Sequence, residues 1–200
     1  MEVSEAINNR TMVREYSERS LTKPERESIL NAGIRAPTAS GNEQWYFLVV
    51  DSPGKREELY RHLIEAQKIY STRMLKKPWS SEQMGKWLSA AEKGAYKAPF
   101  YVAVFVDLRE RFCTIAEIEE LWAQHSIAAA IENMLLEAWG MGIGGCWFGV
   151  PLLMEDKFYD LFGVEDQGLK LAAVLGFGYP KKGTKPRERT KKLADITRVV

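Results

Sequence analysis

The chain is organised around residues 126–149, which read SIAAAIENMLLEAWGMGIGGCWFG. Residues 126–139 predict a helix whose polar side chains are limited to Ser126, Glu132, Asn133 and Glu137. A helix that is apolar on most of its faces must be buried on most of them. Glycines at positions 140, 142, 144 and 145 then allow the main chain to turn sharply and to expose its N–H groups. We interpret this segment as a core helix that delivers a bare backbone loop to a flat or anionic ligand.

The loop admits three other interpretations. Residues 140–145 match the G-x-G-x-x-G dinucleotide fingerprint. That fingerprint carries its mechanism when it follows a strand and opens a helix, whereas this loop follows a helix and precedes a short strand, residues 146–148. Residues 138–154 contain no charge, but five glycines and Pro151 argue against a membrane span. A plain helix end followed by a tight turn stays open beside the ligand-binding loop.

Length and composition indicate one globular domain, residues 1–200, that can bury a sizeable core. Hydrophobic residues make up 46% and charged residues 28% of the chain, which are values typical of globular proteins. The formal net charge of +1 predicts no general attraction to nucleic acid or to an anionic membrane. Two cysteines without metal-type spacing and the absence of a signal-peptide pattern favour a reduced, cytoplasmic protein.

The rest of the chain predicts helices that alternate irregularly with strands, which favours an α+β sheet covered by helices. Thr22 and Glu25 form a capping-box pattern that starts a helix ending near Arg35. The run at residues 45–50 is continuously apolar and predicts a central strand. Further strands are expected at residues 99–106 and 169–177, and further helices at residues 53–67 and 154–162.

Residues 68–97 are the least readable segment, because Trp79 and Trp87 stand among lysines with Pro78 as a helix breaker. The two tryptophans could form a lid over a pocket or pack on a neighbouring helix. Neither histidine, His62 or His125, has a matched catalytic partner, and no metal-ligand or paired-carboxylate spacing is present. We therefore expect a cofactor to carry the chemistry, with no catalytic side chain and no metal.

Arginines give a second indication of a ligand. Arg10 and Arg14 lie near the end of a first short helix, and Arg187 and Arg189 lie in the tail. Guanidinium groups bind phosphate through two parallel hydrogen bonds, so both pairs could converge on one phosphate monoester. Residues 181–192 hold seven basic residues and one acid, a run typical of a solvated linker and too short to indicate a nucleic-acid arm.

Four motifs, in matching order along nearly the whole chain, resemble the nitroreductase family of FMN-dependent flavoproteins. They are the basic segment Arg10–Tyr16, the Ala36–Ala39 loop that leads to Trp45, the helix and glycine turn from Glu132 to Trp147, and Gly176–Pro180 followed by Arg187 and Arg189. Met12 replaces a serine that is common in the family, and the family's asparagine falls on Gly41 or Asn42. Glu43-Gln44 replaces the common Gln-Pro pair. These departures suggest a divergent subgroup.

The resemblance implies which residues bind FMN. The opening motif would contribute Arg10, Thr11, Met12 and Arg14, and the loop would contribute Pro37, Thr38, Ala39, Ser40, Gly41 and Asn42. The glycine turn would contribute Gly144 and Gly145, and the C-terminal segment Arg187 and Arg189. The same resemblance implies a nitroreductase-like fold, with a central, mostly antiparallel sheet flanked by helices.

The resemblance also implies a homodimer with an FMN at each of two sites between the subunits. Residues 196–200 would add a strand to the partner's sheet, and residues 37–42 would reach the partner's flavin. The implied reaction moves two electrons from NAD(P)H to a nitroaromatic, a quinone or a related small acceptor. Related flavin chemistry on the same fold, namely flavin cleavage, reductive dehalogenation or ring dehydrogenation, stays an alternative, as does flavin binding without catalysis.

Overall fold

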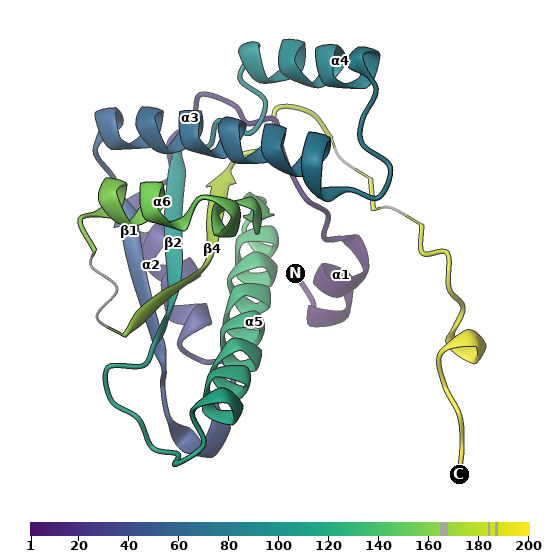
Figure 1. The fold of residues 1–200 in the computed structure, drawn as a ribbon. Coiled ribbons are helices and arrows are strands. Elements are labelled where there is room, and N and C mark those ends of the chain that lie inside the picture. Colours follow the sequence, from purple (N-terminus) through teal and green to yellow (C-terminus); the bar gives the residue numbers. More distant parts are fainter. Residues whose placement is uncertain (165–167, 184, 187) are drawn as a thin grey trace.

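The computed structural model describes residues 1–164, 168–183, 185–186 and 188–200, and it contains a four-stranded antiparallel sheet (Figure 1). The strands follow the spatial order β1-β2-β4-β3. Their bounds are Trp45–Val50 for β1, Phe100–Asp107 for β2, Gly144–Phe148 for β3 and Leu169–Gly178 for β4. The α+β class and the antiparallel sheet predicted from the sequence are therefore confirmed.

Strand β2 separates two hydrophobic cores, because its successive side chains point to opposite faces of the sheet. Phe100, Val102, Val104 and Val106 join the core on one face of the sheet. Tyr101, Ala103 and Phe105 join the core on the opposite face. Both faces of β2 are covered, so its continuous apolar run is explained by burial on both sides.

Helix α5, Ala116–Gly140, and helix α2, Lys23–Gly33, cover one face of the sheet (Figure 1). Helix α2 begins with the predicted capping box, in which the Thr22 N–H donates to Glu25 Oε2 at 2.7 Å. The prediction that the central helix begins at Ser126 is wrong, since α5 starts ten residues earlier. Its first turns look like solvent-facing sequence, but Glu119 is fully buried and hydrogen-bonded to Gln44, Arg111 and the Phe112 N–H.

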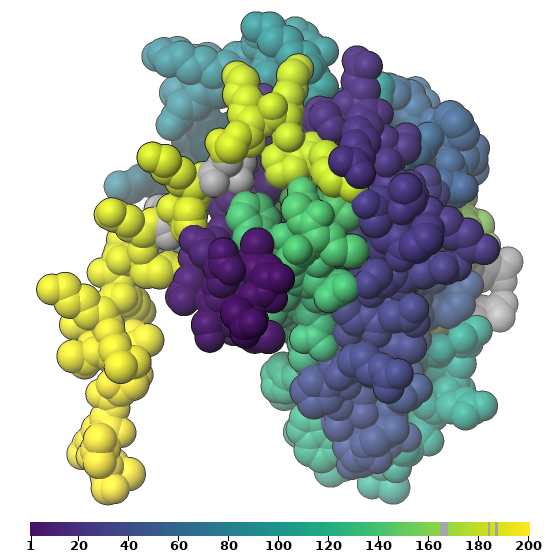
Figure 2. All heavy atoms as spheres, turned by 180° about the vertical axis from the view of Figure 1, so that it is seen from behind, coloured from purple at the N-terminus to yellow at the C-terminus, as the bar shows by residue number. Residues whose placement is uncertain are grey.

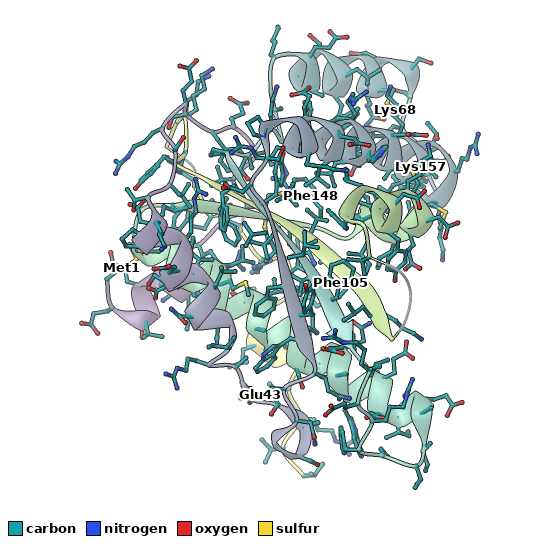
Figure 3. All side chains as sticks on the ribbon, turned by 90° about the vertical axis from the view of Figure 1, so that its left-hand side faces the viewer. Met1, Glu43, Lys68, Phe105, Phe148 and Lys157 are labelled. Carbon is teal, nitrogen blue, oxygen red and sulfur yellow. The ribbon has the colours of Figure 1, made fainter. Side chains whose placement is uncertain are left out.

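The opposite face of the sheet carries α3, Pro53–Ile69, and α6, Glu155–Phe162. Helix α3 continues into a π-helical turn, Tyr70–Met74, and a further helix, α4, spans Ser81–Glu92. Figure 3 shows Phe105 and Phe148 among the interior side chains, whereas Lys68 and Lys157 lie on the outer helices. A short 3-10 helix, Val150–Leu153, connects β3 to α6.

Strand β1 lies at the edge of the sheet, so the prediction of a central strand at residues 45–50 is wrong. Its burial is mixed, and Tyr46 and Val49 are 38% and 39% exposed. A continuously apolar run does not distinguish a central strand from an edge strand with an apolar outer surface. An exposed, apolar edge of this kind is a template for pairing with another chain.

The two termini pack less tightly than the body. Helix α1, Val3–Asn9, lies beside α5, and the described residues 188–200 extend away from the body (Figure 2). A short 3-10 helix spans Leu193–Asp195, and residues 196–200 form no strand within this chain. Among the described residues, no helix is both long and apolar enough to cross a membrane.

Candidate functional site

The N-terminal motif lies directly beside the strand that follows the glycine turn. The Val13 N–H donates to the Gly145 carbonyl at 3.0 Å, and Met12 and Gly145 form an isolated parallel bridge. The Val13 side chain is fully buried. Two motifs more than 130 positions apart in the sequence are thus joined through their backbones.

Glycine is required at these positions for different physical reasons. Gly142 has a φ of +76° and ends α5 in a tight turn, as one of the two remaining interpretations predicted. A Cβ at Gly144 would lie 2.2 Å from Val13 Cγ2, and a Cβ at Gly145 would lie 2.4 Å from Leu135 Cδ2. Gly144 and Gly145 are therefore required by close packing inside the chain, a cause that the sequence did not reveal.

Arg10 is held against α5 by an ion pair. Its Nε donates to Glu132 Oε1 at 3.0 Å, and the Arg10 side chain is 16% exposed. This bond uses the Nε atom of Arg10. The two terminal amino groups of the guanidinium can therefore donate to another acceptor. Thr11 and Met12, which follow Arg10, are both partly buried.

A cavity of about 400 Å³ opens beside the same segment. The Arg14 side chain lines it together with aromatic residues and the β3 backbone, and the lining consists of Arg14, Gln67, Trp79, Tyr96, Cys146, Trp147, Phe148, Gly149 and Val150. Its volume lies in the range of small-molecule sites, about 300–1,000 Å³. Its aromatic walls suit a flat ring, and its one charged group, Arg14, suits a partly anionic one.

Tyr96 occupies a strained position in the cavity wall. It has a φ of +72°, which is uncommon for a bulky residue. Its N–H donates to the Arg14 carbonyl at 2.6 Å, and its own carbonyl accepts from the Tyr101 hydroxyl at 2.8 Å. The surrounding structure thus fixes the Tyr96 ring next to the residue that resembles the family's flavin-binding arginine.

The two tryptophans of the unreadable segment have different positions. Trp87 packs between Trp79 and Tyr96, with ring centroids 6.1 Å and 5.9 Å away, respectively. Trp79 lines the cavity, so it forms part of a pocket wall. Of the two alternatives, packing on neighbouring side chains describes Trp87. Trp79 packs on Trp87 and also lines the cavity. Sequence reasoning noticed both tryptophans but missed Gln67 and Tyr96, which belong to no motif. Trp147 ends the glycine-turn motif, but it was not assigned to the site.

Among the described residues that line this cavity, none is a strong nucleophile or base. Burial raises the pKa of the Cys146 thiol to about 11, against which the nearby Arg14 charge acts only weakly, so the thiol is neutral near pH 7. Burial also raises the pKa of Tyr16 well above its usual value, and its hydroxyl donates to the Val13 carbonyl at 2.7 Å. The described residues include no cluster of groups that could hold a metal ion.

The predicted loop at residues 37–42 lies elsewhere on α5. The Ala39 N–H donates to Ser126 Oγ at 3.3 Å, and Ser40 and Gly41 have φ values of +53° and +74°. The Asn42 amide turns back onto the carbonyls of Ala39 and Ser40. Ser126 lies about 21 Å along the helix axis from Gly140, where the glycine turn starts. Within one chain, the structure therefore does not bring this loop, including Pro37 and Thr38, to the cavity beside Arg14.

The tail is the remaining predicted contributor. Arg189 is exposed and lies in the segment that leaves the body (Figure 2), and Arg187 lies outside the described residues. The convergence of these arginines with Arg10 on one phosphate stays a prediction.

Comparisons with known proteins agree on one family. The sequence model of the nitroreductase family matches residues 7–179. A protein of Archaeoglobus fulgidus, provisionally named NADH dehydrogenase/NAD(P)H nitroreductase, is 29% identical over 177 residues, which cover 88% of this chain and 83% of that protein. A Bacillus subtilis protein with the provisional name NAD(P)H nitroreductase YfhC is 28% identical and covers 95% of each chain.

Solved structures show the same fold. A nitroreductase of Bacteroides fragilis, crystallised with bound FMN, has a TM-score of 0.68 and 27% identity, and the match covers 100% of both chains. A nitroreductase-like protein of Bacillus cereus has a TM-score of 0.73 at 19% identity and covers 100% of this chain and 96% of its own.

Proposed function

This chain belongs to the nitroreductase family, and we propose that it is an FMN-dependent oxidoreductase. It would move two electrons from NAD(P)H to a nitroaromatic, a quinone or a related small acceptor. One observation of the structure carries the proposal. The Arg10–Arg14 segment is joined to Gly145 beside a cavity that has aromatic walls and a single charged group, Arg14.

The residues present fit FMN. Arg10 offers terminal amino groups for a phosphate, and the aromatic walls around Tyr96 offer flat surfaces for a ring system. The relative from Bacteroides fragilis, which binds FMN, matches this chain over its whole length and supports the same cofactor here. When bound, FMN would supply the hydride-accepting and electron-donating chemistry that no side chain of this cavity can supply.

The chain's own residues would bind FMN, orient its ring and polarise it. Arg14 would place a positive charge at the cavity, where negative charge on a reduced ring is stabilised electrostatically. Arg10, held by Glu132, would anchor the phosphate end. Because the Cys146 thiol is neutral near pH 7, it would line the cavity without reacting.

We also propose that the protein works as a homodimer. Strand β1 lies at the edge of the sheet, with Tyr46 partly exposed on one face and Val49 on the other, and it offers its backbone to a further strand. The tail exposes Leu193, Ile196, Val199 and Val200, with Val199 98% exposed, and thus offers a strand without a partner in its own chain. Exchange of the tails between two subunits would cover both surfaces and could bring the 37–42 loop to the partner's cavity.

A visible spectrum tests the proposed function. The purified protein should be yellow, should release FMN on denaturation, and should bleach under anaerobic conditions when NADH or NADPH is added. Reoxidation by a panel of nitroaromatics and quinones should follow. A colourless protein that cannot be reconstituted with FMN would contradict the cofactor, and a yellow protein that neither nucleotide reduces would indicate flavin binding without this catalysis.

A further inference from the structure

A second cavity, which we call the basic cavity, lies next to the candidate site. It measures about 400 Å³ and is lined by four lysines, Lys86, Lys93, Lys181 and Lys182, against one acid, Glu15. The lysines come from α4 and its end and from the segment after β4, which lie more than 80 positions apart. The whole chain has a formal net charge of only +1, so this concentration of cations is a local feature.

The charges of the basic cavity are largely uncompensated. Lys86 pairs with Glu82 at 2.6 Å. Within the part of the chain that the structure describes, Lys93, Lys181 and Lys182 form no salt bridge. Several ammonium groups around a concavity create a positive potential that attracts anions, and lysine is a common phosphate ligand. The cavity therefore suits a ligand group with more than one negative charge.

The basic cavity shares a wall with the cavity beside Arg14. Glu15 and Tyr16 line the basic cavity, and Gly94 and Ala95 do so too, while the residues adjoining these pairs, Arg14 and Tyr96, line the other cavity. The Tyr96 N–H bonds to the Arg14 carbonyl, which ties the two segments of the wall together. The two cavities are thus neighbours across one layer of backbone.

The backbone of the lysine pair is also anchored to the candidate site. The Lys181 N–H donates to the Glu15 carbonyl at 3.0 Å, and Tyr16 and Pro180 form an antiparallel bridge. Both lysines stand at a fixed position of the main chain before the tail begins, so their ammonium groups stay near the cavity while their side chains remain adjustable.

From these observations we propose that the basic cavity binds the 2′-phosphate of NADPH and so makes the protein select NADPH over NADH. This inference rests on the proposed function. The two donors differ by that one phosphate, which carries a charge of about −1.5 to −2 at neutral pH. A donor whose nicotinamide reaches the flavin held beside Arg14 would extend its other end over the shared wall toward the basic cavity. Selectivity is the difference between the binding free energies of the two donors. A side chain that contacts only the 2′-phosphate therefore changes the selectivity directly.

The test uses the flavin-loaded protein and a charge-reversed variant, Lys181→Glu with Lys182→Glu. Rapid mixing under anaerobic conditions measures the rate of flavin reduction at increasing donor concentrations. The concentration dependence of this rate gives the apparent dissociation constant of each donor. The wild type should bind NADPH about tenfold more tightly than NADH, since a few exposed charge contacts add up to that size. The variant should lose this preference through weaker NADPH binding, with NADH as the internal control. Lys76→Glu with Lys77→Glu, an exposed pair outside the basic cavity, is the matched control and should keep the preference.

A binding measurement separates this inference from the proposed function. Calorimetric titration should show 2′,5′-ADP binding to the wild type more tightly than 5′-ADP, which has similar charge without the 2′-phosphate, and the Lys181/Lys182 variant should abolish the difference. Equal binding of the two nucleotides, or an unchanged preference in the variant, would overturn the assignment. If neither NADH nor NADPH reduces the flavin, the proposed function fails, and the titration still decides whether the site exists.

Discussion

Arg10 and Arg189 are predicted to hold the same phosphate, yet the structure places them in very different surroundings. Arg10 is mostly buried, paired with Glu132, and followed by residues that bond to β3. Arg189 is exposed in a segment that leaves the body. The Arg10 half of the proposed phosphate site is thus preformed in a single chain. The Arg189 half belongs to a tail that must become ordered before it can contribute to the site.

The difference teaches where folding and binding are coupled. A preformed group contributes binding energy without further ordering, whereas an extended tail must first lose conformational freedom. The apolar side chains at the end of the tail, Ile196, Val199 and Val200, offer a means of ordering it, because their burial against a partner would hold the preceding arginine in place.

The largest effect is expected from deletion of residues 193–200. The tail's apolar side chains would no longer cover the partner, and obligate interfaces of the proposed kind bury more than about 2,000 Å². Size-exclusion chromatography with light scattering should show loss of the dimer, and the flavin content should fall with it. A soluble, flavin-loaded monomer would show that the tail is not an element between subunits.

Single arginine variants should separate the two halves of the phosphate site. Arg189→Ala should raise the FMN dissociation constant roughly 10- to 150-fold, the value of a charge-assisted bond of about 1.5–3 kcal/mol, without changing the melting temperature of the FMN-free protein. Arg10→Ala should weaken FMN similarly but also lower the melting temperature, because it leaves Glu132 unpaired.

Riboflavin, which lacks the phosphate, is the control for both variants, and its affinity should hardly respond. The double variant should fall short of additivity if both arginines hold one phosphate. Equal losses for riboflavin and FMN would mean that these arginines shape the ring site or the fold.

Gly144→Ala should damage the preformed half through packing alone. The added Cβ would lie 2.2 Å from Val13 Cγ2, a conflict that the buried segment can relieve only by moving. Overpacking of this kind costs about 1–3 kcal/mol, which lowers the melting temperature by roughly 2–12 °C for a chain of this length. Gly140→Ala, where no atom lies within 4 Å of the added Cβ, is the matched control, and calorimetry should show little change.

The parts of the fold that local patterns determine were predictable from the sequence. The run at residues 99–106 is apolar at every position from Phe100 to Val106, and it forms the fully covered strand β2. The Thr22–Glu25 capping box is a local arrangement of hydrogen bonds and forms as expected. Both depend on neighbours in the sequence, which a single chain displays directly.

The misassigned parts depend on contacts that are distant in the sequence. The predicted start of α5 at Ser126 left out the turn that holds Glu119, and the burial of that carboxylate depends on Gln44, 75 positions away. The edge position of β1 depends on the order of the strands. Tyr96 took its place in the candidate site through a positive φ and a bond to the Arg14 carbonyl, neither of which leaves a motif in the sequence.

The smallest effect is expected at Trp79, in the wall of the preformed half. Its ring lines the cavity beside Arg14 and is supported by Trp87 at a centroid distance of 6.1 Å. An aromatic contact of this type is worth about 0.5–1.5 kcal/mol, so Trp79→Ala should raise the Michaelis constant for a nitroaromatic acceptor roughly 2- to 12-fold.

Trp79→Phe should recover most of the loss because it keeps a flat face. Ferricyanide, which has no ring to stack, is the control acceptor in steady-state assays. A proportional loss with ferricyanide would show that Trp79 supports the cavity as a whole, whereas a loss confined to aromatic acceptors would show that the π-helical turn and α4 deliver a wall that contacts them.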